Sequence, residues 1–139
     1  MRYTTAPVSL LVLGCGLLSV ASGQEPAAMK MEHPGDTALS QSAPGEWEYK
    51  SFPGLARLYT YQHDEPSKSH CTEGCASAWP PLRVSAGESD GRVGDWTVIT
   101  RDDGIRQWAY KGHPVYTRYH DLPDDGSSAT DEGFHLLKP

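Results

Sequence analysis

The stretch DWTVITRDDGIRQWAYKGHPVYTRYHD, residues 95–121, decides the fold class. It contains two runs rich in β-branched and aromatic residues, Trp96–Thr100 and Ile105–Tyr110, on either side of an Asp-Gly pair. Such a pair predicts a β-hairpin, because glycine tolerates the positive φ angle that hairpin turns require. A third run, Val115–Thr117, follows shortly afterwards. The stretch therefore predicts three consecutive antiparallel strands in a meander.

The end of this stretch occurs twice in the chain. Leu58–Asp64 (LYTYQHD) and Val115–Asp121 (VYTRYHD) align at a constant offset of 57 residues, with tyrosine, threonine, histidine and aspartate identical. Each copy is followed by a polar segment and then by a closing aromatic residue, Trp79 in the first copy and Phe134 in the second. One half of this size could not bury a sufficient core, so we expect two related halves packed on one another.

These patterns predict a mainly β fold: a small two-repeat antiparallel β domain, built from a hairpin and a meander, with one short helix. The repeats are expected at about residues 52–82 and 108–139. A further strand is expected over Leu55–Tyr61, whose tyrosines and threonine suit a pleated surface.

The one short helix is expected around Cys75 to Trp79. Thr72 is expected to cap its N-terminus, and Pro80-Pro81 to end it, since a proline forces the preceding residue out of the helical region. One or two helical turns are marginally stable alone, so this helix needs to be tied down.

Residues 1–23 have the form of a secretory signal peptide. They contain one basic residue, the apolar run Val8–Leu18 and small residues at Ala21-Ser22-Gly23. A competing interpretation takes Val12–Cys15 as a lipobox, with a lipid anchor on Cys15 as the chain's only contact with a membrane. Both interpretations predict an exported protein of the periplasm or cell envelope, or one secreted beyond it.

The segment Gln24–Gly45 (QEPAAMKMEHPGDTALSQSAPG) has no sustained apolar periodicity and is rich in small and polar residues. It predicts a flexible tether before a folded domain over residues 46–139. The formal net charge of the whole chain is -6. An acidic chain does not suit nucleic acid or anionic lipid as a partner, so an envelope protein or a small ligand is expected instead.

Four segments together carry a family resemblance: LYTYQHD, SHCTEGCASAWPPL, WTVITRDDGIRQWAYKGHPVY and VYTRYHD, in this order. With them, the chain resembles a bacterial predicted-lipoprotein family, a secreted repeat of unknown function with a Tyr-x-(Phe/Trp/Tyr)-x-x-Asp motif. The resemblance covers roughly Phe52 to Pro139 and implies a small exported two-repeat domain, often lipid-anchored, with no established activity. Arg118 departs from the motif, where the second copy should carry an aromatic residue. The residues that fill the motif are Tyr59, Tyr61, Asp64, Tyr116 and Asp121.

Two cysteines, Cys71 and Cys75, remain once the leader is removed. In an exported chain they predict a disulfide, which would close a five-residue loop and hold the short helix. The alternative is a copper or zinc site, because thiolates, imidazoles and thioethers are ligands of these ions. The residues of this alternative are His70, Cys71 and Cys75, with Met29, Met31 and His33 as a second group.

Asp64 and Asp121 each end a motif strand. A carboxylate in that position favours turn capping, by accepting backbone N–H groups, over catalysis. The chain contains no nucleophile, zinc-hydrolase or phosphate-loop motif, so no catalytic residue and no cofactor are predicted. We therefore expect a non-enzymatic exported module with a structural or binding role. The alternative is a periplasmic metal-handling or electron-transfer accessory protein.

Overall fold

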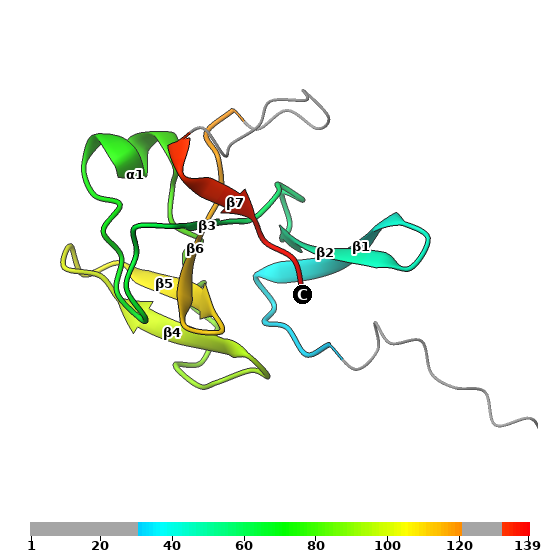
Figure 1. Ribbon diagram of the computed structural model, residues 1–139. Coiled ribbons are helices and arrows are strands. Elements are labelled where there is room, and N and C mark those ends of the chain that lie inside the picture. Colours follow the sequence, from blue (N-terminus) through cyan, green and yellow to red (C-terminus); the bar gives the residue numbers. More distant parts are fainter. Residues whose placement is uncertain (1–30, 121–131) are drawn as a thin grey trace, which may run out of the picture.

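The computed structural model describes residues 31–120 and 132–139, and this part of the chain is mainly β, as predicted. Two strands form a small antiparallel sheet, and five strands form a larger one in the order β4-β5-β6-β3-β7. One short helix stands above the larger sheet in the view of Figure 1. The elements are β1 (Thr37–Ala43), β2 (Glu46–Ser51), β3 (Tyr59–Tyr61), α1 (Gly74–Ala78), β4 (Trp96–Thr100), β5 (Arg106–Tyr110), β6 (His113–Tyr116) and β7 (Phe134–Leu136).

The predicted meander is confirmed by β4, β5 and β6, which pair antiparallel in sequence order. The turn between β4 and β5 contains Gly104 at a φ of +80°. Its N–H donates to Arg101 O at 2.9 Å, and Arg101 N–H donates to Ile105 O at 2.9 Å. A side chain at this φ would be strained, which is why the Asp-Gly pair marks the turn.

The strand β3 lies between β6 and β7, so strands from the second half of the chain flank the first motif copy. The strand predicted over Leu55–Tyr61 is wrong for its first residues. Leu55 has a φ of +53°, which is incompatible with an extended strand, and its N–H donates to Ser51 O at 2.8 Å in a turn. The chain becomes extended only after this turn, and Leu58 is fully buried.

The short helix α1 occupies the predicted place, but its N-terminal cap differs from the prediction. Glu73 is the N-cap residue, with no side-chain hydrogen bond to the helix, so the predicted cap by Thr72 is wrong. Thr72 contributes through its backbone instead, since its carbonyl accepts from Cys75 N–H at 3.0 Å. The helix ends at Ala78, with Trp79 as its C-cap residue immediately before Pro80, as the two prolines predict.

The tether predicted over residues 24–45 is wrong for residues 37–43, which form β1. Gly45, at a φ of +81°, lets the chain turn back into β2, so a Pro-Gly pair that reads as linker closes a hairpin. Just before β1, the buried carboxylate of Asp36 accepts from the indole N–H of Trp108 at 2.8 Å. The folded unit therefore begins about ten residues earlier than predicted. Residues 1–30, including the leader, lie outside the described part of the chain.

The core has two parts. The first contains Trp96 and Trp108, and Tyr49 of β2 reaches it edge-on, with its ring centroid 5.1 Å from that of Trp96. This contact joins the small sheet to the large one. The second part surrounds Trp79 and Phe134. Within the described residues, no helix has the length and apolar character needed to cross a bilayer.

Candidate functional site

The two motif copies lie side by side in the larger sheet. Strands β3 and β6 pair antiparallel, with Tyr59 opposite Tyr116 and Thr60 opposite Val115. Tyr59 and Tyr116 are equivalent positions of the two copies, so the pair lies at the centre of an approximate two-fold relation between them. The repeat seen in the sequence is therefore also a spatial pairing.

Each copy's closing segment returns to the motif strand of the other copy. Leu137 N–H donates to Leu58 O at 2.7 Å, and Leu82 N–H donates to Val115 O at 2.8 Å. Leu58 and Val115 are equivalent positions, and so are the two leucines. A second equivalent pair of bonds follows the same rule: Gln62 N–H to Gly133 O and Tyr119 N–H to Ala78 O, both at 2.9 Å. The two halves are thus interlocked, because the motif strand of each copy is hydrogen-bonded to the closing segment of the other copy.

A stack of side chains crosses the centre of this pair. Trp79 and Phe134, the two closing aromatic residues, lie face to face with ring centroids 3.9 Å apart and an interplanar angle of 6°. Tyr61 stacks on the outer face of Phe134 at 4.4 Å, and the guanidinium of Arg118 lies 5.5 Å from the Trp79 ring centroid. Tyr61 and Arg118 are equivalent positions. The departure from the motif at Arg118 therefore exchanges one outer aromatic layer for a cation–π contact.

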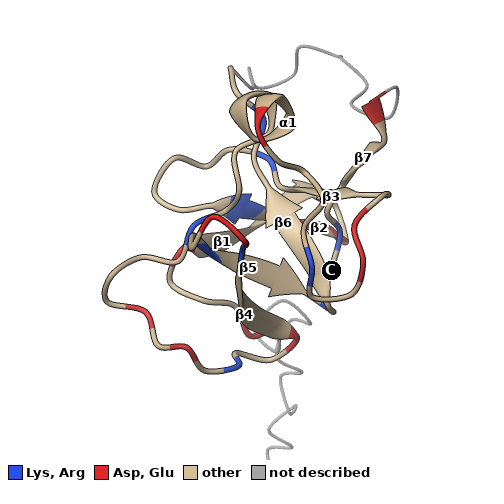
Figure 2. Cartoon of the chain, turned by 90° about the vertical axis from the view of Figure 1, so that its left-hand side faces the viewer, with Lys and Arg blue, Asp and Glu red and all other residues tan. Residues whose placement is uncertain are grey.

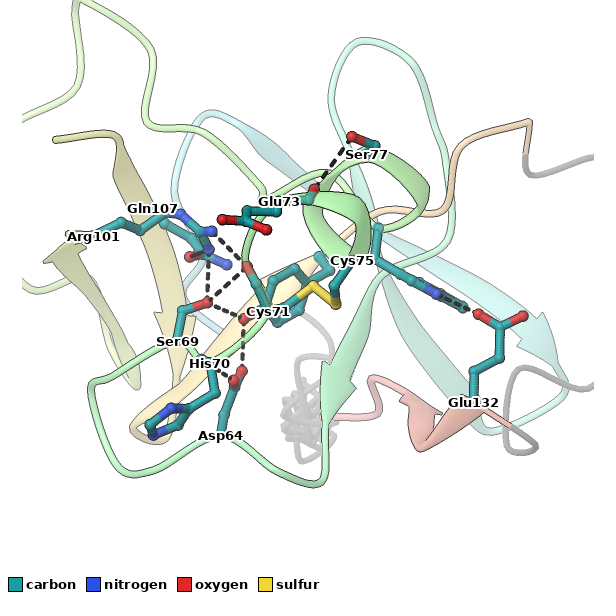
Figure 3. Close-up of a disulfide and its surroundings, with 12 residues drawn as sticks. Asp64, Ser69, His70, Cys71, Glu73, Cys75, Ser77, Arg101, Gln107 and Glu132 are labelled. Atoms are coloured by element: carbon teal, nitrogen blue, oxygen red, sulfur yellow. Dashed lines mark hydrogen bonds between the residues drawn. A yellow bond between two sulfur atoms is a disulfide. The ribbon is translucent and has the colours of Figure 1, made fainter. Parts of the chain in front are cut away.

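A polar cluster surrounds Asp64, with Ser69, His70 and Arg101 close to it (Figure 3). The hydroxyl of Tyr116 belongs to this cluster. It donates to Asp64 Oδ2 at 2.7 Å and lies 2.6 Å from Ser69 Oγ. Asp64 Oδ1 accepts the backbone N–H of His70 at 2.7 Å, which confirms the turn capping predicted for Asp64. The same prediction for Asp121 falls outside the described residues. Sequence reasoning missed the contact with Tyr116, because the two residues come from different copies.

Arg101 completes the cluster from the turn after β4. Its guanidinium, on a side chain only 2% exposed, donates to Ser69 Oγ at 2.7 Å, to Gln107 Oε1 at 2.9 Å and to Cys71 O at 2.6 Å. Gln107 in turn donates to Val115 O at 2.8 Å. Nothing in the sequence marks this arginine, because the two aspartates and the glycine that follow it are typical of a solvated turn. Its charge is buried because four groups satisfy its donors, Asp103 being the fourth.

Burial governs the protonation of the cluster. It raises the pKa of Asp64 above its ordinary value, against the lowering effect of the hydrogen bonds from His70 and Tyr116. Burial also raises the pKa of Tyr116, and the neighbouring carboxylate of Asp64 adds to that effect. Tyr116 therefore stays protonated and donates its hydrogen bond at neutral pH. The polar groups are turned toward one another, an arrangement that holds the two copies in register.

The disulfide predicted between Cys71 and Cys75 is present, with the two Cα atoms 5.2 Å apart. Cys71 is fully buried against the stack, and Cys75 O accepts from Trp79 N–H at 2.7 Å. The bridge thus ties α1 down beside the closing aromatic residue. Because the two sulfurs are bonded to each other, neither is a thiolate ligand in this form.

The alternative metal residues are not brought together. His70 Nε2 lies 3.5 Å from Glu65 Oε1, while His33 Nδ1 lies 3.2 Å from Thr37 Oγ1 in another part of the molecule. Over residues 31–120 and 132–139, no group of three or more His, Cys, Asp or Glu side chains is placed to hold a metal ion. Met29 lies outside the described residues, so metal binding by Met29, Met31 and His33 stays a prediction. The motif residue Asp121 also lies outside them.

An open groove of about 440 Å³ lies between the β1–β2 hairpin and the C-terminal segment, and we name it the hairpin groove. Trp47 of β2 forms one wall and Leu136 of β7 the other. Sequence reasoning used Trp47 only to mark the start of the domain, and no signal in the sequence pairs it with Leu136. Residues that line the groove include Met31, Glu46, Trp47, Glu48, Leu136 and Lys138.

These observations define a class of protein: a small β domain of two interlocked copies, whose motif side chains form an internal scaffold. Residues 97–133 match the model of a family described as a secreted repeat of unknown function. The family resemblance is thereby confirmed for that segment, and a secreted family supports an exported protein. No curated protein and no solved structure matches the chain.

Proposed function

We propose that this chain is a non-enzymatic binding module of the cell envelope, which takes an extended peptide segment in the hairpin groove. The first support is the way the motif residues are used. Asp64, Tyr116 and Arg101 make their hydrogen bonds to other side chains and to backbone of the same domain. Groups satisfied in this way hold a fold together and leave recognition to another surface.

One wall of the hairpin groove is the outer edge of β7, the last strand of the larger sheet. Leu137 N–H points inward, to Leu58 O. Backbone groups of successive strand residues point to opposite sides, so the N–H and C=O of Leu136 point outward, toward the groove. No strand covers this edge in the part of the chain that the structure describes.

The other wall is an edge of β2. Phe52 N–H donates to Asp36 O across the hairpin, while Ser51 N–H donates to Ala56 O on the opposite side. By the same alternation, Trp47 presents its backbone N–H and C=O away from β1. Two strand edges therefore border one groove, and this is the observation that carries the proposal.

An extended polypeptide is the ligand whose chemistry matches two strand edges, because its own N–H and C=O groups alternate in the same way. A peptide side chain would then pack between Trp47 and Leu136, where an indole and an aliphatic chain offer apolar surface. Glu46 and Lys138 lie in the same lining and supply charges of opposite sign. They favour a peptide with an apolar residue between a basic and an acidic one.

The test is selection from a random-peptide display library against the chain without its leader, followed by NMR titration with a selected peptide. Shifts are expected at the backbone amides of Trp47 and Leu136. Trp47→Ala is expected to weaken binding at least about tenfold, as for a buried aromatic anchor. Tyr119→Ala is the matched control, since Tyr119 is exposed and is not among the residues that line the groove.

A second variant isolates the strand edge. Leu136→Pro removes an N–H that points outward, so the domain should stay folded while peptide binding is lost. Binding that survives both variants would place the ligand elsewhere. The enzymatic alternative has its own test: turnover in a broad hydrolase substrate panel that disappears in Asp64→Asn would contradict a non-enzymatic module.

A further inference from the structure

The turn after β2 presents two large apolar side chains to solvent. We name residues 51–56 the Phe52 turn. Four large hydrophobic side chains are exposed among the described residues, and two of them, Phe52 at 57% and Leu55 at 56%, lie three positions apart in this turn. The others, Tyr119 and Leu136, belong to separate segments. Single exposed apolar residues are common, but two on one short turn form a concentrated apolar tip.

The Phe52 turn is held rigidly. Ser51 N–H donates to Ala56 O at 2.9 Å, and Leu55 N–H donates back to Ser51 O at 2.8 Å. The Ser51 hydroxyl oxygen accepts a further bond from Ala56 N–H at 3.0 Å, and Phe52 N–H is fixed to Asp36 O at 2.8 Å. The two apolar side chains therefore stand on a fixed base and lose little backbone freedom on binding.

The conformation of Leu55 shows that the fold does not require its side chain. Its φ of +53° lies in the left-handed region, which suits glycine and strains a leucine. The side chain is also more than half exposed and belongs to neither part of the core, so it adds little packing to offset that strain. A residue that is both strained and exposed points to a contact outside the fold.

Basic residues stand at the base of the turn. Lys50 and Arg57 face each other across a β-bridge, directly before and after residues 51–56. Lys50 also pairs with Glu48 at 3.1 Å. Acidic residues lie on both sides of this region: Glu46 and Glu48 precede the turn on β2, and the loop between α1 and β4 carries Glu88, Asp90 and Asp95. Figure 2 shows the acidic positions of the chain in red and the basic ones in blue.

We propose that the Phe52 turn inserts into the interfacial region of a phospholipid membrane, with Phe52 and Leu55 among the acyl chains and the two cations level with the phosphates. An apolar tip in front of a basic base follows the order of polarity through a bilayer surface. The net charge of -6 opposes a general attraction to anionic lipid. Insertion of the apolar pair is therefore the driving contact, and the cations set its depth.

A membrane fits this turn better than a protein partner does. Protein interfaces centre on an anchor that enters a pocket and is surrounded by further contacts. Here the apolar side chains stand on an exposed turn, and the residues immediately beside them in sequence are Ser51, Pro53, Gly54 and Ala56, none of them a large apolar residue. Binding to a lipid surface requires only that apolar side chains reach the acyl chains, and two side chains on a rigid turn can do so.

The test is co-flotation with vesicles of mixed phosphatidylethanolamine and phosphatidylglycerol. It uses the chain from residue 24, which retains every residue that the structure describes. Wild type is expected to float with the vesicles. Phe52→Ser combined with Leu55→Ser should lower the partition coefficient at least about tenfold. Tyr119→Ser, at the most exposed of the four apolar positions, should bind like wild type.

Leu55→Gly keeps the inference testable whether or not the double variant is well folded. Glycine relieves the left-handed strain, so this variant should raise the midpoint of thermal unfolding while it weakens flotation. Opposite changes in stability and binding are not expected of a residue that serves only the fold.

Three results would overturn the proposal. Wild type that stays in the lipid-free fraction is one, and a double variant that floats like wild type is another. The third is capture of an envelope protein that depends on Phe52 and Leu55 in the absence of flotation, which would assign the turn to a protein partner.

Discussion

The two copies of the repeat solve the same structural problem with different chemistry. Both pair their motif strands, both return a closing segment to the other copy, and both place one aromatic ring at the centre of the stack. Only the first copy has a disulfide, and only the first has an aromatic outer layer, since Arg118 replaces Tyr61 in the second. The features that both copies share are those that the fold requires, whereas the disulfide and the aromatic outer layer can be replaced.

The largest expected effect comes from the shared part. Phe134→Ala should lower the free energy of unfolding by about 3–5 kcal/mol, because it removes a fully buried ring that touches both copies. Trp79→Ala should cost at least as much, since its indole also donates to Glu132 Oε2 at 2.7 Å. Urea denaturation followed by far-UV circular dichroism measures both changes.

Tyr119→Ala is the control for these truncations, because Tyr119 is an exposed ring of the same half. It should change the free energy of unfolding by less than about 0.5 kcal/mol. A loss below about 1 kcal/mol for Phe134→Ala would mean that the stack is not the joint between the copies.

The disulfide ranks second and belongs to one copy alone. Replacing both Cys71 and Cys75 by alanine should lower the free energy of unfolding by about 2 kcal/mol, the chain-entropy value for a five-residue loop. The near-UV circular dichroism of the stacked aromatic rings should persist, since the second copy places Phe134 with no cysteine between residues 115 and 139. Loss of that signal would show that the bridge builds the stack rather than tying α1 down.

Much of this arrangement could be predicted from local signals. The meander followed from alternating β-rich runs and an Asp-Gly turn, and the disulfide from two cysteines in an exported chain. The repeat was visible because Tyr59 and Tyr116 share their neighbours at a constant offset. In each case a few residues close in sequence carry the physical cause.

The errors arose where long-range contacts decide. Residues 37–43 were predicted as part of a tether but form β1. The residue before them, Asp36, is held by a hydrogen bond from the indole of Trp108, a partner 72 residues away that no local pattern can indicate. Arg101 reads as a surface charge beside Asp102 and Asp103, yet it is buried against Ser69 and Gln107. In both places, hydrogen bonds between residues far apart in sequence decide the structure, and the local composition does not indicate it.

The third prediction concerns Asp64, which joins the copies through Tyr116. Asp64→Asn keeps one acceptor for the His70 N–H and loses the carboxylate that accepts from Tyr116. The free energy of unfolding at neutral pH should therefore fall by about 1 kcal/mol, the net value of one hydrogen bond. Urea denaturation at pH 7 measures the change. An unchanged value would mean that the hydrogen bond from Tyr116 to the Asp64 carboxylate adds no net stability.

The pH dependence of the same variant sharpens the result. Burial raises the pKa of Asp64 in the folded chain, so the folded state binds this proton more tightly than the unfolded state. The stability that proton binding by Asp64 adds is then full below its unfolded pKa of about 3.9 and is lost as pH rises through the folded pKa, while the hydrogen bond from Tyr116 remains at neutral pH. The stability difference between wild type and Asp64→Asn should shrink over that window. A difference that grows with pH would contradict the raised pKa.

The smallest expected effect comes from the outer layers of the stack, where Arg118 stands at the position equivalent to Tyr61. Arg118→Tyr makes both outer layers of the stack aromatic, and it should change the free energy of unfolding by less than about 1 kcal/mol, because a partly exposed cation–π contact and an aromatic pair are of similar strength. The sign of the change should depend on salt. Salt screens the charge of Arg118 and leaves a tyrosine unaffected, so the stability of the variant should rise relative to that of wild type as ionic strength rises.

Two further variants serve as controls. Arg118→Ala should lose the contact at every salt concentration, and a stability equal to that of wild type throughout would mean that Arg118 is not a layer of the stack. Tyr61→Arg, at the equivalent position, should make the first copy salt-sensitive in the same sense, because both outer layers cover equivalent rings.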